Sequence, residues 1–189
     1  MSYHHYTTEG IILKRENRGE NDAVYIVFTE LLGLIVLHAS GIRLLKSKLR
    51  FVLQPGNRVH ITVVRGKTLW RVTTCSLVFS LPKDMHIVLL RLYKLLRTHL
   101  VFDEPVMHIY NHVRSFLVVD KNVYTHAPTL RTAEIVTTAR ILSSLGMLDH
   151  MDKTIDESSA LTNEFCSLYE SESLTLLKHV KSRLHESVL

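Results

Sequence analysis

The sequence predicts two domains, a small five-stranded β-barrel followed by an all-α helical domain. Two changes near residue 81 carry this prediction. Before it, apolar residues fall in short β-prone runs separated by turn signals, whereas from Pro82 onward they recur at helical spacing. The charge balance changes at the same place: residues 1–80 hold eleven Lys and Arg against five Asp and Glu, and residues 81–189 hold twelve against thirteen. We therefore expect domains over residues 1–81 and 82–189 with different tasks.

The first domain has the pattern of five short strands. We expect them over Glu9–Lys14, Ala23–Thr29, Leu34–Ser40, Val59–Val63 and Leu69–Val78. Arg65-Gly66-Lys67 has the composition of a compact hairpin turn between the last two strands. Five strands with one long insertion between the third and the fourth are typical of a closed barrel of the OB type. In such barrels an open face and its flanking loops bind oligonucleotides.

The second domain begins with an amphipathic helix within Ile87–Phe102, in which leucines recur every three or four positions. Three cations, Arg91, Lys94 and Arg97, interrupt this apolar window. The charges exclude a membrane span and predict a helix with one face in the core.

Further helices follow along the chain. Asp103 is a candidate N-cap for a helix that ends near Val118, and another helix is expected from about Thr129 to a terminal glycine, Gly146. Two more are expected over about residues 156–169 and 174–184. The N-terminus has no apolar signal core, and the two cysteines, far apart in sequence, are expected to be a reduced pair, with one disulfide as the alternative.

Residues 31–83 contain nine Lys and Arg but no Asp or Glu. Unneutralised positive charge attracts polyanions, of which nucleic acid is the commonest in cells. Lys46, Lys48 and Arg50 recur every second residue, so in an extended segment they would line one side, along a phosphate backbone. A solvated surface loop is the alternative interpretation. Trp70 and Phe51 are the rings that could stack on bases.

The predicted DNA-binding set combines this stretch with the end of the first strand and the last hairpin. Its members are Lys14, Arg15, Arg18, Arg43, Lys46, Lys48, Arg50, Arg65, Lys67, Arg71 and Trp70.

No catalytic residue, cofactor or metal site is predicted. The sequence has no glycine-rich nucleotide-binding loop. Glu20 and Asp22 could be metal-binding carboxylates of a nuclease, but no third ligand accompanies them at a suitable spacing. Such carboxylates commonly accept backbone N–H bonds or pair with a cation. His108 and His112 stand four apart, a spacing compatible with a shared metal, although surface or core histidines are the simpler interpretation.

The stripe of Arg91, Lys94 and Arg97 has three interpretations. The cations could lie in water, could receive an acidic peptide with an apolar end, or could lie on an anionic membrane. The first is the simplest. We predict partner binding at this stripe and expect no membrane partner.

Several linked motifs resemble the bacterial recombination mediator RecO family across roughly residues 7–80. They are Thr8–Lys14, Gly19–Asp22, Phe28–Glu30 with Gly33, Ala39–Arg43, Lys46–Arg50 and Leu53–Pro55. Beyond residue 81 the resemblance rests on Asp103-Glu104-Pro105 and Leu145-Gly146. Many members carry a cysteine-rich zinc module after the equivalent of Gly146, whereas no cysteine pair follows it here, so the chain resembles a short form of the family.

The resemblance implies an N-terminal OB fold, a helical domain and a non-enzymatic role in DNA repair and homologous recombination. It implies binding of single- and double-stranded DNA, annealing of complementary strands and loading of the RecA recombinase, so RecA is an indirect partner. The implied direct partners are a RecR-like protein and the acidic tail of the single-strand-binding protein, in the bacterial cytoplasm at the nucleoid. The alternative function is a docking scaffold whose basic face binds acidic protein tails rather than DNA.

Overall fold

The computed structural model describes residues 4–82, 85–118, 127–148 and 161–169, together with 173, 175–178 and 180–182. Contacts divide the chain into two compact units, Met1–Tyr110 and Asn111–Leu189, which we describe separately. The division into residues 1–81 and 82–189 stays a prediction about domains. In the structure the helix that follows residue 82 belongs to the same compact unit as the barrel.

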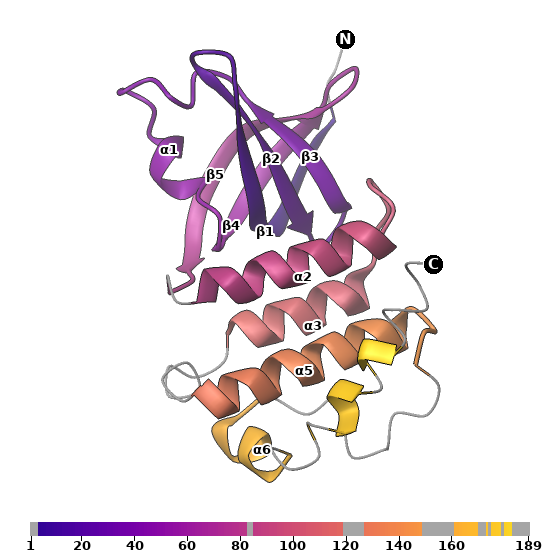
Figure 1. Ribbon diagram of the computed structural model, residues 1–189. Coiled ribbons are helices and arrows are strands. Elements are labelled where there is room, and N and C mark those ends of the chain that lie inside the picture. Colours follow the sequence, from indigo (N-terminus) through magenta and orange to yellow (C-terminus); the bar gives the residue numbers. More distant parts are fainter. Residues whose placement is uncertain are drawn as a thin grey trace. The chain divides into compact units, whose positions relative to one another are not determined.

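The first unit contains the predicted barrel. Its strands are β1 (His5–Arg18), β2 (Asp22–Thr29), β3 (Gly33–Ala39), β4 (Asn57–Arg65) and β5 (Trp70–Ser80), and they close in the order β1-β2-β3-β5-β4 (Figure 1). Among the pairings of these five strands, the short one between β3 and β5 is parallel and the others are antiparallel. The OB-type barrel followed by helices is confirmed. Each strand is longer than or offset from its prediction, because polar residues at the ends continue the ladders that the apolar runs begin.

Strand β1 pairs with two neighbours in turn. Its first half pairs with β4 and its second half with β2, and the register shifts between Ile12 and Lys14. A bulge of this kind bends a strand, which lets β1 curl around the barrel. Inside, buried apolar side chains from all five strands form one core, among them Ile12, Tyr25, Leu37 and Val63.

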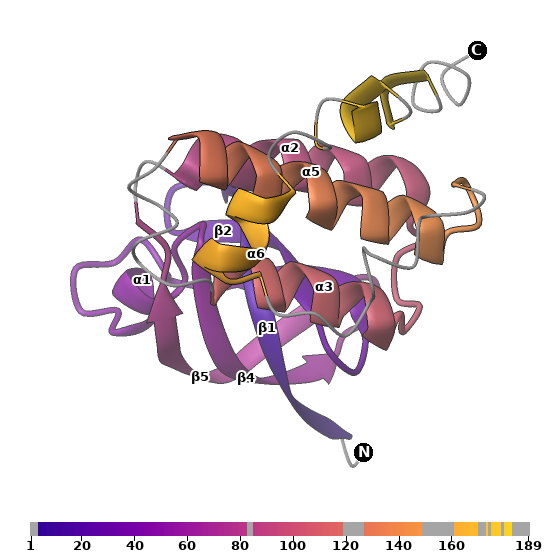
Figure 2. The same ribbon diagram turned by 90° about the horizontal axis from the view of Figure 1, so that it is seen from below.

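The connection between β3 and β4 is compact. Residues 41–52, which we name the arm, form successive turns and a four-residue helix, α1 (Leu49–Val52), that lies beside β5 in both views (Figures 1 and 2). The segment is not extended, so Lys46, Lys48 and Arg50 do not line one side of it. Lys48 has helical backbone angles and Arg50 lies within α1, where residues two apart point in different directions.

Helix α2 (His86–His99) follows the barrel, and residues 100–106 connect it to α3 (Met107–Leu117). This connection lies against the start of β3: Phe102 forms a parallel bridge with Leu34, and the Asp103 N–H donates to the Leu34 carbonyl oxygen (2.9 Å). The connection therefore covers the part of the β3 edge that β5 does not reach.

Asp103 is not the N-cap of α3, as the sequence had suggested, because the helix begins four residues later at Met107. Its own backbone is left-handed, with φ 64°. Its carboxylate is turned to the barrel instead. Tyr110, at the end of the first unit, packs edge-on against Phe28 and donates its hydroxyl hydrogen to Glu9 (2.9 Å).

The boundary between the units falls within α3, and the second unit also contains α5 (Ala127–Ser144) and α6 (Asn163–Leu168). Gly146 is the predicted terminal glycine of α5: its φ is 70°, and the Met147 N–H returns to the Leu142 carbonyl oxygen (2.9 Å). Thr162 caps α6 by accepting the Phe165 N–H. The helix predicted over 156–169 and the helix predicted over 174–184 lie partly outside the described residues.

Both cysteines are free thiols, one in each unit. Burial raises the pKa of the Cys75 thiol to about 12 and that of Cys166 to about 11. Cys166 is fully buried and Cys75 packs against the barrel core, so each serves as a small packing residue.

Candidate nucleic-acid interface

A hollow of about 960 Å³ lies on the outer surface of the barrel beside the β4–β5 hairpin. Six of its eleven lining residues are Lys, Arg or His, and no Asp or Glu is among them. We name it the basic hollow. Its basic and titratable residues are His5, Arg18, His38, Arg65, Lys67 and Arg71.

The strand registers explain why these residues meet. His5 is paired with Val64, Val64 with Arg71, and Arg71 with His38, so one row crosses β1, β4, β5 and β3. Residues paired across neighbouring strands share a face of the sheet. Because Trp70 points into the core, its neighbour Arg71 points outward, and the two histidines lie on the same outer face.

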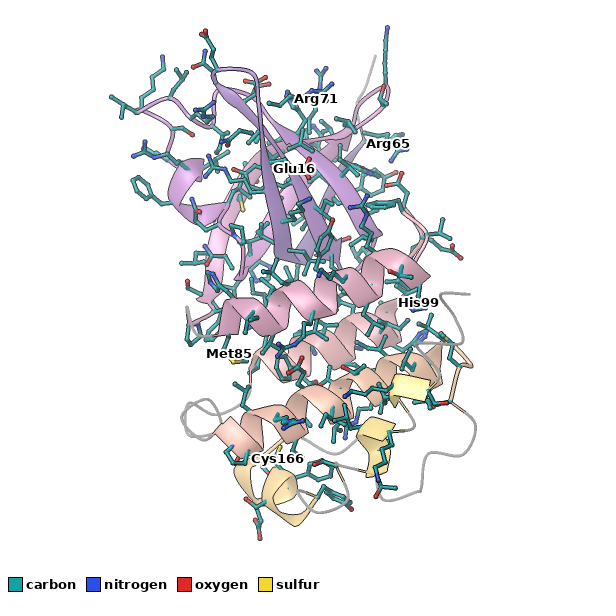
Figure 3. All side chains as sticks on the ribbon, viewed as in Figure 1. Glu16, Arg65, Arg71, Met85, His99 and Cys166 are labelled. Carbon is teal, nitrogen blue, oxygen red and sulfur yellow. The ribbon has the colours of Figure 1, made fainter. Side chains whose placement is uncertain are left out.

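The loops complete the hollow from its ends. Gly66, Lys67, Thr68 and Leu69 of the β4–β5 hairpin contribute one rim, and Arg18, at the end of β1, contributes another. Figure 3 shows Arg65 and Arg71 at the end of the barrel where this hairpin lies. The face of β2 and β3 with the β1–β2 and β4–β5 loops is where OB folds bind oligonucleotides.

Arg65 is already engaged by a carboxylate. Its Nη1 lies 2.6 Å from Oδ2 of Asp103, and its guanidinium lies over the Trp70 ring, 4.8 Å from the ring centre. The other Asp103 oxygen accepts the indole N–H of Trp70 (2.7 Å). Trp70 is only 6% exposed and packs edge-on against Tyr6, so its ring offers no open face to a base.

We predict that Asp103 stabilises the barrel through Trp70 more than through Arg65. Asp103→Asn keeps an oxygen for the indole N–H and tolerates the left-handed backbone, so it should cost under about 1 kcal/mol. Asp103→Ala leaves the indole N–H without its partner and should cost about 2 kcal/mol. Urea unfolding followed by the fluorescence of Trp70, the sole tryptophan, measures both. Equal losses for the two variants would contradict this ranking.

Lys14 and Arg15 lie apart from the basic hollow. The Lys14 ammonium pairs with Glu16 (2.5 Å) and lies 5.9 Å from the centre of the Tyr93 ring on α2. This pairing raises the pKa of Lys14 and lowers that of Glu16. Arg15 is paired across the strands with the buried Tyr25, so it shares the inner face, and burial raises the pKa of the Tyr25 hydroxyl.

The arm carries the remaining predicted cations. Arg43, Lys46 and Lys48 are exposed, and Arg50 is half-buried with its guanidinium 4.8 Å from the centre of the Phe51 ring. The arm is bound to the β1–β2 turn, because the Arg43 N–H donates to the Asn21 carbonyl oxygen (2.9 Å) and the Arg43 guanidinium to that of Gly19 (2.9 Å).

The arm therefore adjoins the basic hollow. Arg18, which lines the hollow, directly precedes the turn that holds the arm, and the turn, the arm and the β4–β5 hairpin lie at one end of the barrel (Figure 1). Of the predicted cations, Arg18, Arg65, Lys67 and Arg71 meet in the hollow, and Arg43, Lys46, Lys48 and Arg50 continue from it.

His5 and His38 were not among the predicted residues. Their positions follow from strand pairing, which periodicity alone does not specify. His38 also lies 3.1 Å from Oδ2 of Asp22, whose other oxygen accepts the Gly41 N–H (2.8 Å). Asp22 thus has the role expected of such a carboxylate, binding a backbone N–H and a basic side chain.

No group of three or more His, Cys, Asp or Glu is placed to hold a metal ion in the part of the chain that the structure describes. His108 is exposed and His112 is buried. Among the described helices, none combines the length and the apolar character that crossing a membrane requires.

The α2 stripe is exposed as predicted for a helix with an apolar inner face. Arg91, Lys94 and Arg97 are exposed, and Arg97 donates to the Tyr93 hydroxyl oxygen (3.2 Å). Two apolar side chains lie on the same surface of the helix: Ile87 is 61% exposed and Leu90 51%. The stripe thus places apolar and cationic groups side by side.

The barrel part of the chain is similar to known proteins. Residues 1–81 match the family model described as Recombination protein O N terminal. A DNA repair protein RecO from Alkaliphilus metalliredigens is 34% identical over 65 residues, which are 34% of this chain and 26% of that relative. The aligned part thus spans about a quarter of the relative's length. By its barrel order and this match, the part of the chain over residues 1–81 is similar to the N-terminal domain of the RecO family.

Proposed function

We propose that this chain is a non-enzymatic accessory protein of DNA repair and homologous recombination that binds DNA through the basic hollow and the arm. One observation carries the proposal. Arg18, Lys67 and Arg71 line an acid-free hollow at the loops of an OB barrel, and none of the three has a described carboxylate within ion-pair distance. A hollow of this kind suits the phosphates of a polyanion.

Binding through phosphates carries no sequence preference. Single strands and duplexes both present a chain of phosphates, so both are proposed ligands. When the cations neutralise phosphates of two complementary strands, the mutual repulsion of the strands falls and base pairing becomes easier. We propose that strand annealing follows from this electrostatic effect.

The test of DNA binding is a titration of labelled single-stranded and duplex oligonucleotides at several salt concentrations. About six cations, three in the hollow and three on the arm, face solvent without a described acid. If each meets one phosphate, the logarithm of the binding constant should fall with the logarithm of the salt concentration with a slope of about −5 for duplex and about −4 for single strands. A binding constant that does not change with salt concentration, or the absence of binding, would refute the proposal.

The similarity of residues 1–81 to the RecO family suggests further partners. We propose a RecR-like protein and the acidic tail of the single-strand-binding protein as direct partners, RecA as an indirect one, and action at the bacterial nucleoid. An annealing assay with strands coated by single-strand-binding protein tests these partners together with DNA contact. If the chain anneals bare strands but not coated ones, the proposed partnership with the single-strand-binding protein is contradicted.

A second candidate function rests on the α2 stripe. Exposed Ile87 and Leu90 beside Arg91 and Lys94 suit a peptide that is acidic and ends in apolar residues. Under this alternative the chain is a docking scaffold whose basic surfaces bind protein tails rather than DNA.

We predict that Leu90→Ala with Lys94→Glu weakens binding of such a peptide about fivefold, because one apolar contact and one exposed charge are lost. Fluorescence anisotropy of a labelled acidic peptide measures the effect. Lys46→Glu with Lys48→Glu on the arm is the control, with DNA affinity lowered and peptide affinity kept. If only the arm variant lowers the affinity for the peptide, the peptide does not bind at α2.

A further inference from the structure

The arm exposes large apolar side chains among its cations. Leu45 is 88% exposed, Phe51 68% and Leu44 39%, and Leu45 is the most exposed large apolar side chain that the structure describes. Ile42 in the arm and Leu53 directly after it are each 1% exposed or less. The segment therefore places some apolar groups in the core and holds others in solvent.

Hydrogen bonds hold these exposed groups in position. The Leu44 N–H donates to Gly41 (3.1 Å) and the Ser47 N–H to Leu44 (3.0 Å), so two consecutive turns present Leu44 and Leu45. Three further bonds, from Arg43 and Gly41, tie the base of the arm to the β1–β2 turn. Leu45 is thus displayed by an ordered turn.

The charge around the exposed apolar groups indicates what they contact. Arg43, Lys46 and Lys48 flank Leu44 and Leu45, Arg50 adjoins Phe51, and residues 31–83 contain no acid. A second copy of the arm would bring like charges together, which disfavours self-association. The occupant must be anionic and must also present apolar faces.

We propose that the arm binds unpaired bases of a single DNA strand, with Leu45 and Phe51 against base faces and the flanking cations on phosphates. This inference rests on the proposed function. A strand whose phosphates follow the hollow reaches the arm across the β1–β2 turn, and its bases are free to turn toward apolar side chains. In a duplex the bases are stacked and paired, so the arm adds little there.

An anionic lipid surface has the same charge and apolar chemistry. An interfacial helix that binds a membrane has a continuous apolar face, whereas α1 has four residues. The geometry favours bases over lipid.

The experiment compares two double variants of the full chain. Leu45→Ala with Phe51→Ala removes the two most exposed apolar groups of the arm. Leu31→Ala with Val101→Ala is the matched control, because these side chains are 46% and 67% exposed but lie outside the arm. Binding to a single strand containing the fluorescent base 2-aminopurine, and to a duplex, is measured at three salt concentrations.

The arm variant should bind the single strand about tenfold more weakly at every salt concentration with the salt slope unchanged, because a lost stacking contact is not electrostatic. The change in 2-aminopurine fluorescence on binding should be smaller for the arm variant than for the unaltered chain. The affinity of the arm variant for the duplex should stay within about twofold of that of the unaltered chain. The control should match the unaltered chain. Vesicles of phosphatidylglycerol and phosphatidylcholine are tested as a third ligand. We expect no vesicle binding that depends on Leu45 and Phe51.

The failures are distinguishable. If the unaltered chain binds no oligonucleotide, the proposed function and this inference both fail. If it binds DNA with a salt slope but the arm variant binds single strands equally well, only this inference is overturned. Vesicle binding that requires Leu45 and Phe51, with single-strand binding unaffected, would assign the arm to lipid instead.

Discussion

Gly33→Ala should destabilise the barrel unit by about 3 kcal/mol or more. Gly33 has φ 66°, a left-handed conformation that costs an alanine about 1 kcal/mol. An added Cβ would also lie 1.8 Å from the backbone oxygen of Glu104, so the connection between α2 and α3 must move. Its displacement breaks the Asp103 N–H bond to Leu34 and the Asp103 contacts with Trp70 and Arg65.

Gly19→Ala is the matched control for this prediction. Gly19 has nearly the same φ, 64°, but an added Cβ there meets nothing within 4 Å. Its cost should be the conformational one alone, about 1 kcal/mol. Urea unfolding followed by Trp70 fluorescence and circular dichroism gives both values. If the two alanines cost the same, the α2–α3 connection does not press on the β2–β3 turn as described.

The barrel could be predicted because its signals are local. Alternation in Val59–Val63, the Arg65-Gly66-Lys67 hairpin and the long third connection each constrain one element, and together they suit few folds. The lengths of the strands could not be predicted this way. His5 and Arg65 lie in strands because their neighbours pair across the sheet, and that pairing is a tertiary effect.

Asp103 shows why a correct local rule can mislead. An aspartate before Glu104-Pro105 has the features of an N-cap, yet its carboxylate binds two groups more than thirty residues earlier in the chain. The conformation of the arm could not be predicted for a related reason. A two-residue spacing of cations indicates one face only in an extended strand, and turns and α1 occupy that segment instead.

The candidate site could be predicted in composition but not in arrangement. The acid-free stretch identified Lys67 and Arg71, while the meeting of Arg18 and His38 with them depends on the closure of β3 on β5. The same closure turns Trp70 inward, so of the two predicted stacking rings Phe51 is the exposed one. Sequence patterns give the charge of a surface, whereas strand register decides which charges share it.

Neutralising the hollow with Arg18→Gln, Lys67→Gln and Arg71→Gln should reduce DNA affinity about a hundredfold near about 0.15 M salt. The salt slope for duplex should become less steep by about 3, because three phosphate contacts are lost. These side chains are exposed and glutamine is polar but uncharged, so the barrel should keep its stability. Binding isotherms at four salt concentrations, with single-stranded and duplex DNA, give both quantities.

The control has the same change in net charge at another place. Arg91→Gln, Lys94→Gln and Arg97→Gln remove three exposed cations from α2 and should change DNA affinity by no more than about threefold. If both triple variants weaken binding equally, DNA responds to the overall charge of the chain and has no site at the hollow. If only the hollow variant does, the arginines and the lysine that strand closure gathers beside the β4–β5 hairpin are the phosphate contacts, and a change in slope counts them.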